Sequence, residues 1–398
     1  MNLKSVIATI GFQSSEIFFV RIYLTLISLL SAAVLVREWG VEVKGEYALF
    51  FSCITICYII LAVGTQYALF HFLNEDIGNY QLVKNIYIRH ISVAFLITFI
   101  FITIIEYIGL AYLGFETIKS LKFLLPVGLL SIFLNALVET YYISSSKIRS
   151  LTIFRVLRLS SQVGISLFII LNFEKNLNLL LIGYILSDLT NNFVFLLLIN
   201  RVQQFSKTKL RLREFYRFAI SSSPQSILQL SPNTLFPFLT GNFLGLEMLG
   251  LLTVANSFGN FLLMFFKTVS SLLQREFTNM DILVKKKLLQ STILLHFLLY
   301  SIISFITFFV IGFLVELIYG LKGQEIKILC MVVILLGFPT TLQSYVNAFF
   351  MSSGKPIIAS KFNIITAILL GFSSVIFLQY FDLVLTILLL FVFRLIIV

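Results

Sequence analysis

The sequence Gly40-Val41-Glu42-Val43-Lys44-Gly45 returns later in the chain as Gly245-Leu246-Glu247-Met248-Leu249-Gly250. A serine follows each copy, seven residues after its second glycine, so four matching positions recur at a separation of 205 residues. A second pair of segments, 141–147 and 349–355, matches at a separation of 208 residues in two aromatic residues, two serines and a final lysine. Two matches at nearly the same separation favour a chain built from two copies of one fold.

The composition is that of an integral membrane protein. Of the 398 residues, 59% are hydrophobic and only 12% are charged, whereas a soluble protein has about 25% charged residues. The mean hydropathy is +1.01. Because a membrane-spanning helix needs about 20 mostly apolar residues, the chain has room for about ten to twelve such helices and not for a large soluble domain.

Apolar windows separated by polar breaks predict an all-α fold of twelve transmembrane helices. The predicted spans are 12–36, 45–72, 87–110, 121–146, 151–171, 178–200, 215–240, 248–272, 288–314, 326–352, 357–379 and 383–398. Each half then contains six helices, and since six is even, the two copies cross the membrane in the same direction as parallel repeats. The expected domains are a six-helix lobe at 1–200, a basic cytoplasmic linker at 201–217 that leads into span seven, and a second six-helix lobe at 215–398.

The basic residues predict the orientation of the chain. If both termini are cytoplasmic, twenty-one Lys and Arg residues, Arg394 among them, lie on the cytoplasmic side and seven on the other, as the positive-inside rule requires. Orientation therefore accounts for the net charge of +11, and nucleic acid is not an expected partner. Orientation also accounts for the basic linker at 201–217, for which binding of anionic lipid is the alternative.

Several kinds of site are not expected. The cysteines Cys53, Cys57 and Cys330 lie in apolar runs without further ligands nearby, so neither a disulfide framework nor a metal site is predicted. No nucleotide-binding P-loop motif occurs. No cofactor is expected. The short outer loops argue against a membrane enzyme such as a glycosyltransferase, because sugar chemistry needs paired carboxylates in a shaped aqueous site.

Ionisable residues deep in a span are candidates for function because a charge inside a bilayer is costly. Asp188 lies near the middle of span six, Arg21 lies nine residues into span one, and Glu139 lies seven residues before the end of span four. His296, in span nine, is interpreted as a hydrogen-bonded interior histidine.

Arg155, Arg158 and Gln162 are spaced i, i+3, i+7 and therefore lie on one face of span five. Guanidinium groups bind phosphate oxygens two at a time, so this face is a candidate to hold a diphosphate. The competing interpretation, given equal weight, is that Arg155 and Arg158 only follow the positive-inside rule.

Span seven contains three of the six prolines of the chain and a stripe of polar residues. Each proline removes a backbone hydrogen bond and bends the helix. The stripe runs through Ser222, Ser226, Gln229 and Asn233, and in lipid it has to face protein or water. A bent polar helix at this place favours a gate that lines a cavity; hydrogen bonding between helices is the alternative.

The segment 36–49, which reads Val-Arg-Glu-Trp-Gly-Val-Glu-Val-Lys-Gly-Glu-Tyr-Ala-Leu and follows a helix carrying Arg21, resembles the opening of the polysaccharide flippases. These proteins export O-antigen and capsule repeat units and belong to the multidrug/oligosaccharidyl-lipid/polysaccharide exporter (MOP) superfamily. The copy at 245–250 and the Ser-Ser-Gly-Lys turn at 352–355 are similar to counterparts in their second half. The resemblance covers the whole chain in span number and loop length.

The resemblance implies a multi-pass protein of the bacterial inner membrane with no enzymatic activity. Such a protein moves an undecaprenyl-diphosphate-linked oligosaccharide from the cytoplasmic to the periplasmic leaflet by alternating access of two lobes. A polysaccharide polymerase and other assembly proteins would be its partners, beside the lipid bilayer. Multidrug extruders of the same superfamily share the twelve-helix plan, so a cation-coupled extruder of drugs or metabolites is the alternative.

The two hypotheses assign different residues. A flippase would use Arg21, Arg158 and Arg155 to attract the diphosphate, and Gln229 and Asn233 to contact the sugars. An extruder would use Asp188 or Glu139 to bind the coupling proton or sodium ion.

Overall fold

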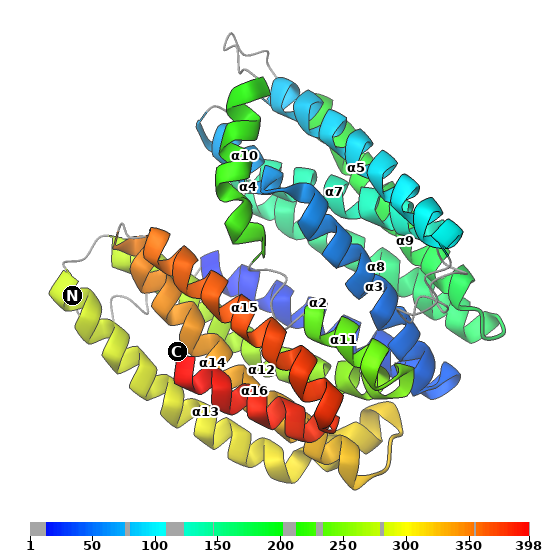
Figure 1. The fold of residues 1–398 in the computed structure, drawn as a ribbon, viewed down its shortest axis with the longest axis vertical. Coiled ribbons are helices and arrows are strands. Elements are labelled where there is room, and N and C mark those ends of the chain that lie inside the picture. Colours follow the sequence, from blue (N-terminus) through cyan, green and yellow to red (C-terminus); the bar gives the residue numbers. More distant parts are fainter. Residues whose placement is uncertain are drawn as a thin grey trace. The chain divides into compact units, whose positions relative to one another are not determined.

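The computed structural model describes residues 13–75, 80–108, 123–145, 147–201, 212–227, 234–278, 282–353 and 356–397, and every regular element in these ranges is a helix (Figure 1). The fourteen helices are α2 (Gln13–Trp39), α3 (Val41–Ala62), α4 (Thr65–Glu75), α5 (Tyr80–Ile108), α7 (Leu124–Ser144), α8 (Ile148–Asn172), α9 (Leu177–Arg201), α10 (Leu212–Ile227), α11 (Leu235–Phe243), α12 (Leu246–Thr278), α13 (Ile282–Tyr319), α14 (Gln324–Ser352), α15 (Pro356–Tyr380) and α16 (Leu383–Ile397). Among the described residues, nine helices are long and apolar enough to cross a membrane, and α16 is a shorter apolar helix.

Each of the twelve predicted spans has a helical counterpart, and the second is divided. The second span becomes α3 and α4, separated by a turn at Val63 and Gly64, where φ is +43° and +74°. A Cβ on Gly64 would lie 2.2 Å from the carbonyl oxygen of Ala219, so glycine lets α10 pack against this turn. The seventh span becomes α10 and α11, and residues 228–233 between them lie outside the described ranges.

The helices form two compact units, here called unit 1 and unit 2. Unit 1 combines Met1–Gly45 with Phe243–Val398, and unit 2 is Glu46–Asn242. Unit 1 therefore includes the first span, since α2 packs on α12 and α13, and unit 2 includes α10, which packs on α4. The lobes expected at 1–200 and 215–398 stay a prediction, because residues 202–211 of the linker lie outside the described part of the chain.

Both units are organised around one central helix. In unit 2, α7 packs against α4, α5, α8 and α9, and α8 packs on α9. In unit 1, α14 packs against α12, α13, α15 and α16, and α15 packs on α16. The repeated segments 141–147 and 349–355 begin within α7 and α14, so the two central helices correspond. The packing inside each unit therefore agrees with the duplication that the sequence predicts.

The repeated glycines have the same backbone conformation. Gly40 and Gly245 have φ of +94° and +91°, a left-handed conformation that favours glycine, and each directly precedes a helix, α3 or α12. The first residues of these two helices, all in unit 1, approach closely: a Cβ on Gly45 would lie 1.8 Å from the carbonyl oxygen of Leu246, and one on Gly250 would lie 2.1 Å from the carbonyl oxygen of Val41. The motif thus marks a close backbone contact within unit 1, which small residues permit.

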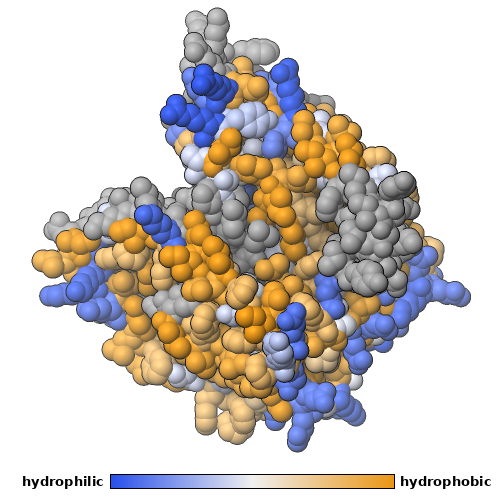
Figure 2. Space-filling view, in the orientation of Figure 1, coloured by the Kyte–Doolittle hydropathy of each residue, from blue (hydrophilic) through white to orange (hydrophobic). Residues whose placement is uncertain are grey.

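Large apolar side chains cover much of the surface (Figure 2). On α13 alone, Leu283, Phe305, Phe309 and Phe313 are each at least 65% exposed. A soluble protein rarely exposes apolar patches of this extent, because they associate in water. Such faces are suited to contact with lipid tails, as expected of a multi-pass membrane protein.

Candidate functional site

Three helices of unit 2 bring together seven polar side chains, here called the Arg158 cluster. They are Ser131, Asn135 and Glu139 on α7, Arg155, Arg158 and Gln162 on α8, and Asp188 on α9. Residues spaced three, four or seven apart share one face of a helix, and this brings the members on α8 to the same side. The stripe expected on span five is therefore present, and it contacts charged residues of both neighbouring helices.

Arg158 lies at the centre of the cluster. Its Nε lies 2.7 Å from Oδ1 of Asp188, and its Nη1 lies 3.6 Å from Oε1 of Glu139 and donates a hydrogen bond to Oδ1 of Asn135. The side chain of Arg158 is 24% exposed, and that of Asp188 only 8%. The two charges stabilise each other, because either of them alone would be costly in a low-dielectric interior.

Arg155 binds the second carboxylate. Its Nη2 lies 2.6 Å from Oε2 of Glu139 and its Nε lies 3.3 Å from Oε1, which is a bidentate contact. Gln162 donates a hydrogen bond of 2.7 Å to Oδ1 of Asp188, and Ser131 donates one to Oδ2. Both carboxylates are thus held on both oxygens. Two guanidinium groups face two carboxylates, so the cluster carries no net charge.

The sequence prediction named Glu139 on α7 but not Ser131 or Asn135. The three residues are spaced i, i+4, i+8 and form one polar stripe along an apolar helix. That stripe is the signal by which the sequence could have revealed them. Between Arg158 and Gln162 on α8, Ser161 accepts a hydrogen bond of 2.7 Å from Nδ2 of Asn191 and adds to the polar contact between α8 and α9.

The remaining predicted substrate contacts lie beyond what the structure describes. Arg21 belongs to α2, with its side chain outside the described part of the chain. Gln229 and Asn233 fall within 228–233, which lie outside the described residues. The structure therefore brings Arg155, Arg158, Glu139 and Asp188 together, and the roles of the other three residues stay predictions.

In unit 1, His296 on α13 is 2% exposed and lies among aromatic and hydroxyl groups. Its Nε2 lies 2.7 Å from Oγ1 of Thr341, and its Nδ1 lies 3.4 Å from the hydroxyl of Tyr345. Its ring stacks on Phe338 with ring centres 5.2 Å apart. The interpretation of His296 as a hydrogen-bonded interior histidine is confirmed.

The last helix places one more charge inside unit 1. Arg394 on α16, counted from the sequence among the orienting charges, is only 5% exposed and lies within the bundle. Its Nη2 donates a hydrogen bond of 2.6 Å to Oε1 of Gln343 on α14. The amides of Gln343 and Asn347 both donate to Oδ1 of Asn363 on α15, at 2.9 and 3.0 Å. These four residues, here called the Arg394 cluster, connect three helices.

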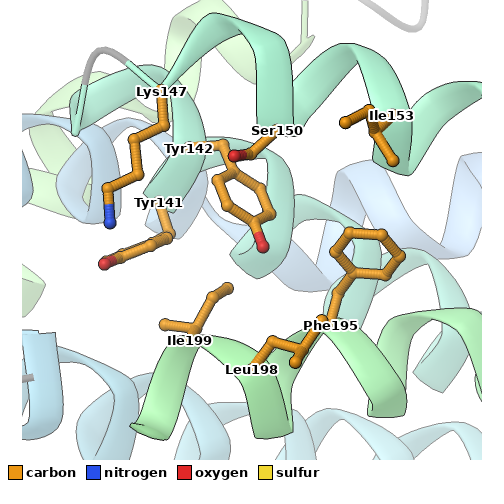
Figure 3. A pocket seen from close by; sticks show the side chains of 8 residues that line it. All are labelled: Tyr141, Tyr142, Lys147, Ser150, Ile153, Phe195, Leu198 and Ile199. Atoms are coloured by element: carbon orange, nitrogen blue, oxygen red, sulfur yellow. The ribbon is translucent and has the colours of Figure 1, made fainter. Parts of the chain in front are cut away.

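A pocket of about 240 Å³ lies between α7, α8 and α9, near the end of α7 (Figure 3). It is lined by Tyr141, Tyr142, Lys147, Ser150, Ile153, Phe195, Leu198 and Ile199. Lys147 is the charged residue in this lining, and its Nζ lies 5.7 Å from the ring centre of Tyr141. The pocket is smaller than the ~300–1,000 Å³ of drug-sized sites and contains none of the predicted site residues. Among the described residues, no group of three or more His, Cys, Asp or Glu side chains could hold a metal ion.

Solved membrane transporters have a similar arrangement of helices. An inward-facing multidrug resistance MATE family transporter of the MOP superfamily matches with a TM-score of 0.70 and 15% identity over 94% of each chain. The lipid II flippase MurJ, in an inward closed conformation, matches with a TM-score of 0.68 and 14% identity over 96% of this chain and 85% of its own. This chain has the MOP fold. A MOP superfamily transporter from Pyrococcus furiosus also has it, with a TM-score of 0.62 and 14% identity over 96% of this chain and 91% of that one.

The MOP fold confirms the predicted fold class, an all-α membrane protein of twelve transmembrane helices in two parallel six-helix repeats. The proteins of similar fold are transporters and a flippase, not enzymes. No family model matches the chain, and no curated protein matches its sequence. At 14–15% identity the likeness establishes the MOP fold alone, so the substrate has to be argued from the site.

Proposed function

We propose that this chain is a flippase of the bacterial inner membrane. It moves an undecaprenyl-diphosphate-linked oligosaccharide repeat unit from the cytoplasmic to the periplasmic leaflet by alternating access, for the synthesis of O-antigen, capsule or a similar surface polysaccharide. The Arg158 cluster carries the proposal, because two arginines held inside a MOP fold are suited to bind phosphate oxygens bidentately. The likeness in fold to a flippase of lipid II supports the same class of substrate.

The charge balance of the cluster suggests how it works. Arg155 and Arg158 are 32% and 24% exposed, so a diphosphate can reach both of them. A bound diphosphate replaces Glu139 as their partner, and the freed carboxylate then takes up a proton or another cation. Glu139 is 24% exposed and Asp188 only 8%, so in this proposal Glu139 exchanges the coupling ion and Asp188 keeps Arg158 in position.

Residues outside the cluster complete the proposal. Arg21 supplies a further positive charge for the diphosphate, and Gln229 and Asn233 contact the sugars. Both termini lie in the cytoplasm, as the excess of basic residues on one side favours. A polysaccharide polymerase and other assembly proteins receive the translocated repeat unit.

A cation-coupled extruder of drugs or metabolites is the second candidate. Asp188 favours it, because a carboxylate buried in a span is a typical binding site for a coupling proton or sodium ion. The likeness in fold to a MATE family transporter favours it as well. In this case Asp188 or Glu139 binds the ion, and the arginines only neutralise these acids between transport cycles.

Deletion of the gene is expected to remove the surface polysaccharide and to leave lipid-linked repeat units on the cytoplasmic side. In this proposal the repeat unit crosses the membrane from the cytoplasmic leaflet, so a block in translocation makes it accumulate there. Immunoblots of the surface glycan and mass spectrometry of the lipid-linked intermediates measure the two effects.

The wild-type gene should restore export, and so should Lys322→Gln, because Lys322 is 79% exposed and forms only a surface ion pair with Glu316. A deletion strain that keeps its surface glycan and becomes sensitive to drugs would contradict the flippase and select the extruder.

A further inference from the structure

The Arg394 cluster lacks the negative charge that the Arg158 cluster contains. Both clusters lie on the central helix of a unit and on two helices that pack against it, α7, α8 and α9 in unit 2 and α14, α15 and α16 in unit 1. The arginines of unit 2 bind two carboxylates. None of the ion pairs among the described residues includes Arg394, although Arg394 is more deeply buried than Arg155 and Arg158.

The two clusters occupy equivalent positions in the repeat. The equivalent pairs, each 208 residues apart, are Asn135 and Gln343, Glu139 and Asn347, and Arg155 and Asn363. The same separation relates the segments 141–147 and 349–355. Arg394 lies 206 residues after Asp188, again on the last helix of its half. Unit 1 therefore has polar residues at these three positions, with an amide and an arginine where unit 2 has its two carboxylates.

Arg394 also has hydrogen-bonding capacity that the surrounding chain leaves unused. A guanidinium has five N–H donors, and the Nε of Arg394 is buried without a partner. The Oδ1 of Asn347 is buried without a partner as well. Buried polar atoms are almost always hydrogen-bonded, so each exception needs an explanation. Gln343, which donates a hydrogen bond to Asn363, orients the guanidinium, but neither amide supplies a charge.

We infer that the Arg394 cluster is a binding site for a phosphate-type anion. An external anion would supply both the missing charge and an acceptor for the free donor, and phosphate oxygens match the guanidinium fork. Gln343, Asn347 and Asn363 are partly exposed, which leaves an approach to the cluster from the surface of unit 1. Two ligands have this chemistry, the diphosphate of a lipid-linked substrate and the headgroup of an anionic phospholipid. The assignment to the diphosphate of a lipid-linked substrate rests on the proposed function, and the assignment to a phospholipid headgroup does not.

Gln343→Glu tests the inference by building the missing charge into the chain. The new carboxylate would take the place of Oε1, 2.6 Å from Nη2 of Arg394, and would compete with an external anion. We expect this variant to bind geranylgeranyl diphosphate at the Arg394 cluster about tenfold to a hundredfold more weakly than the wild type, the range expected for one charged hydrogen-bonding contact, and to keep the binding proposed for the Arg158 cluster. We also expect it to melt at a higher temperature. Both are measured on the full-length protein in phosphatidylcholine nanodiscs, by ligand titration and by thermal unfolding.

Two further variants serve as controls. Lys322→Gln changes the net charge by the same amount at an exposed position and should bind the probe as the wild type does. Asn135→Asp, at the equivalent position of unit 2, should not raise the melting temperature, because Arg158 already has two carboxylate partners there. A second titration, with phosphatidylglycerol in the nanodiscs, separates the two sources of the anion. The ligand is the probe whose binding Gln343→Glu weakens.

Equal binding of both probes by the wild type and by Gln343→Glu would overturn the inference, and so would a wild type that binds neither. A higher melting temperature with unchanged binding would likewise refute it, because Arg394 would then only connect three helices. The assay involves no export. Its failure is therefore distinct from failure of the flippase proposal, which the glycan of the deletion strain decides.

Discussion

Arg158→Leu is expected to abolish export of the surface polysaccharide and to destabilise the protein strongly. The substitution would leave the carboxylate of Asp188, 8% exposed, without the cation that now lies 2.7 Å away. It would also remove one of the two guanidinium groups at Glu139. Breaking a buried ion pair by removing one partner costs about 3–5 kcal/mol, because the other charge stays buried and unpaired. Thermal unfolding of the purified protein and glycan immunoblots of the complemented deletion strain measure the two effects.

A double variant separates the charges from the packing. Arg158→Gln combined with Asp188→Asn removes both charges and keeps polar groups that can bond to each other and to Gln162. It should regain most of the lost melting temperature, because no unpaired charge remains, but it should not export, because the guanidinium is gone. Export by the double variant would refute the assignment of Arg158 as a phosphate ligand. A wild-type melting temperature for Arg158→Leu would show that the ion pair between Arg158 and Asp188 does not stabilise the protein.

The sequence predicted the order of the helices well, because hydropathy reports directly on which segments can lie in a bilayer. It did not predict the break within the second span. The turn at Val63 and Gly64 lies in an apolar run, and one glycine in such a run changes the hydropathy little. This turn needs glycine because Ala219 on α10 approaches it closely. That contact joins segments far apart in the sequence, so the sequence pattern alone does not reveal it.

The same limit applies to the candidate site. Helical spacing was enough to place Arg155, Arg158 and Gln162 on one face of α8, because that relation is local. It could not show that this face meets Glu139 and Asp188, since the choice of neighbouring helices depends on tertiary packing. Charge counting, in turn, left open whether the arginines of span five serve orientation or function. The structure adds that both form ion pairs inside the bundle, and their role stays a prediction.

Arg394 illustrates the limit most clearly. Near the end of an apolar helix, an arginine is normally expected to extend to the membrane surface and contribute to orientation. The structure instead places it 5% exposed against Gln343, an amide on a helix about fifty residues earlier in the chain. Only the packing of α14, α15 and α16 distinguishes the two cases.

Gly45→Ala and Gly250→Ala are expected to prevent stable folding. The Cβ added at Gly45 would lie 1.8 Å from the carbonyl oxygen of Leu246, and the one added at Gly250 would lie 2.1 Å from the carbonyl oxygen of Val41. Both contacts are with backbone atoms, so no side chain can rotate away, and the backbone at 41–45 and 246–250, within unit 1, would have to separate. Overpacking of this kind costs about 3 kcal/mol or more. Fluorescence-detected size-exclusion chromatography of tagged protein in detergent measures the loss of monodisperse protein.

Gly164→Ala is the matched control, because the same methyl group at this helical position meets no atom within 4 Å. Alanine is the better helix former, so the control should be neutral or more stable by up to about 1 kcal/mol. The contrast tests why both halves of the chain carry the Gly-x-Glu-x-x-Gly motif. We expect the second glycine of the motif to be required because two backbones touch there, whereas a glycine such as Gly164 can be replaced by alanine. Equal yield and melting temperature for Gly45→Ala and Gly164→Ala would show that the backbone at Gly45 and Leu246 does not approach this closely.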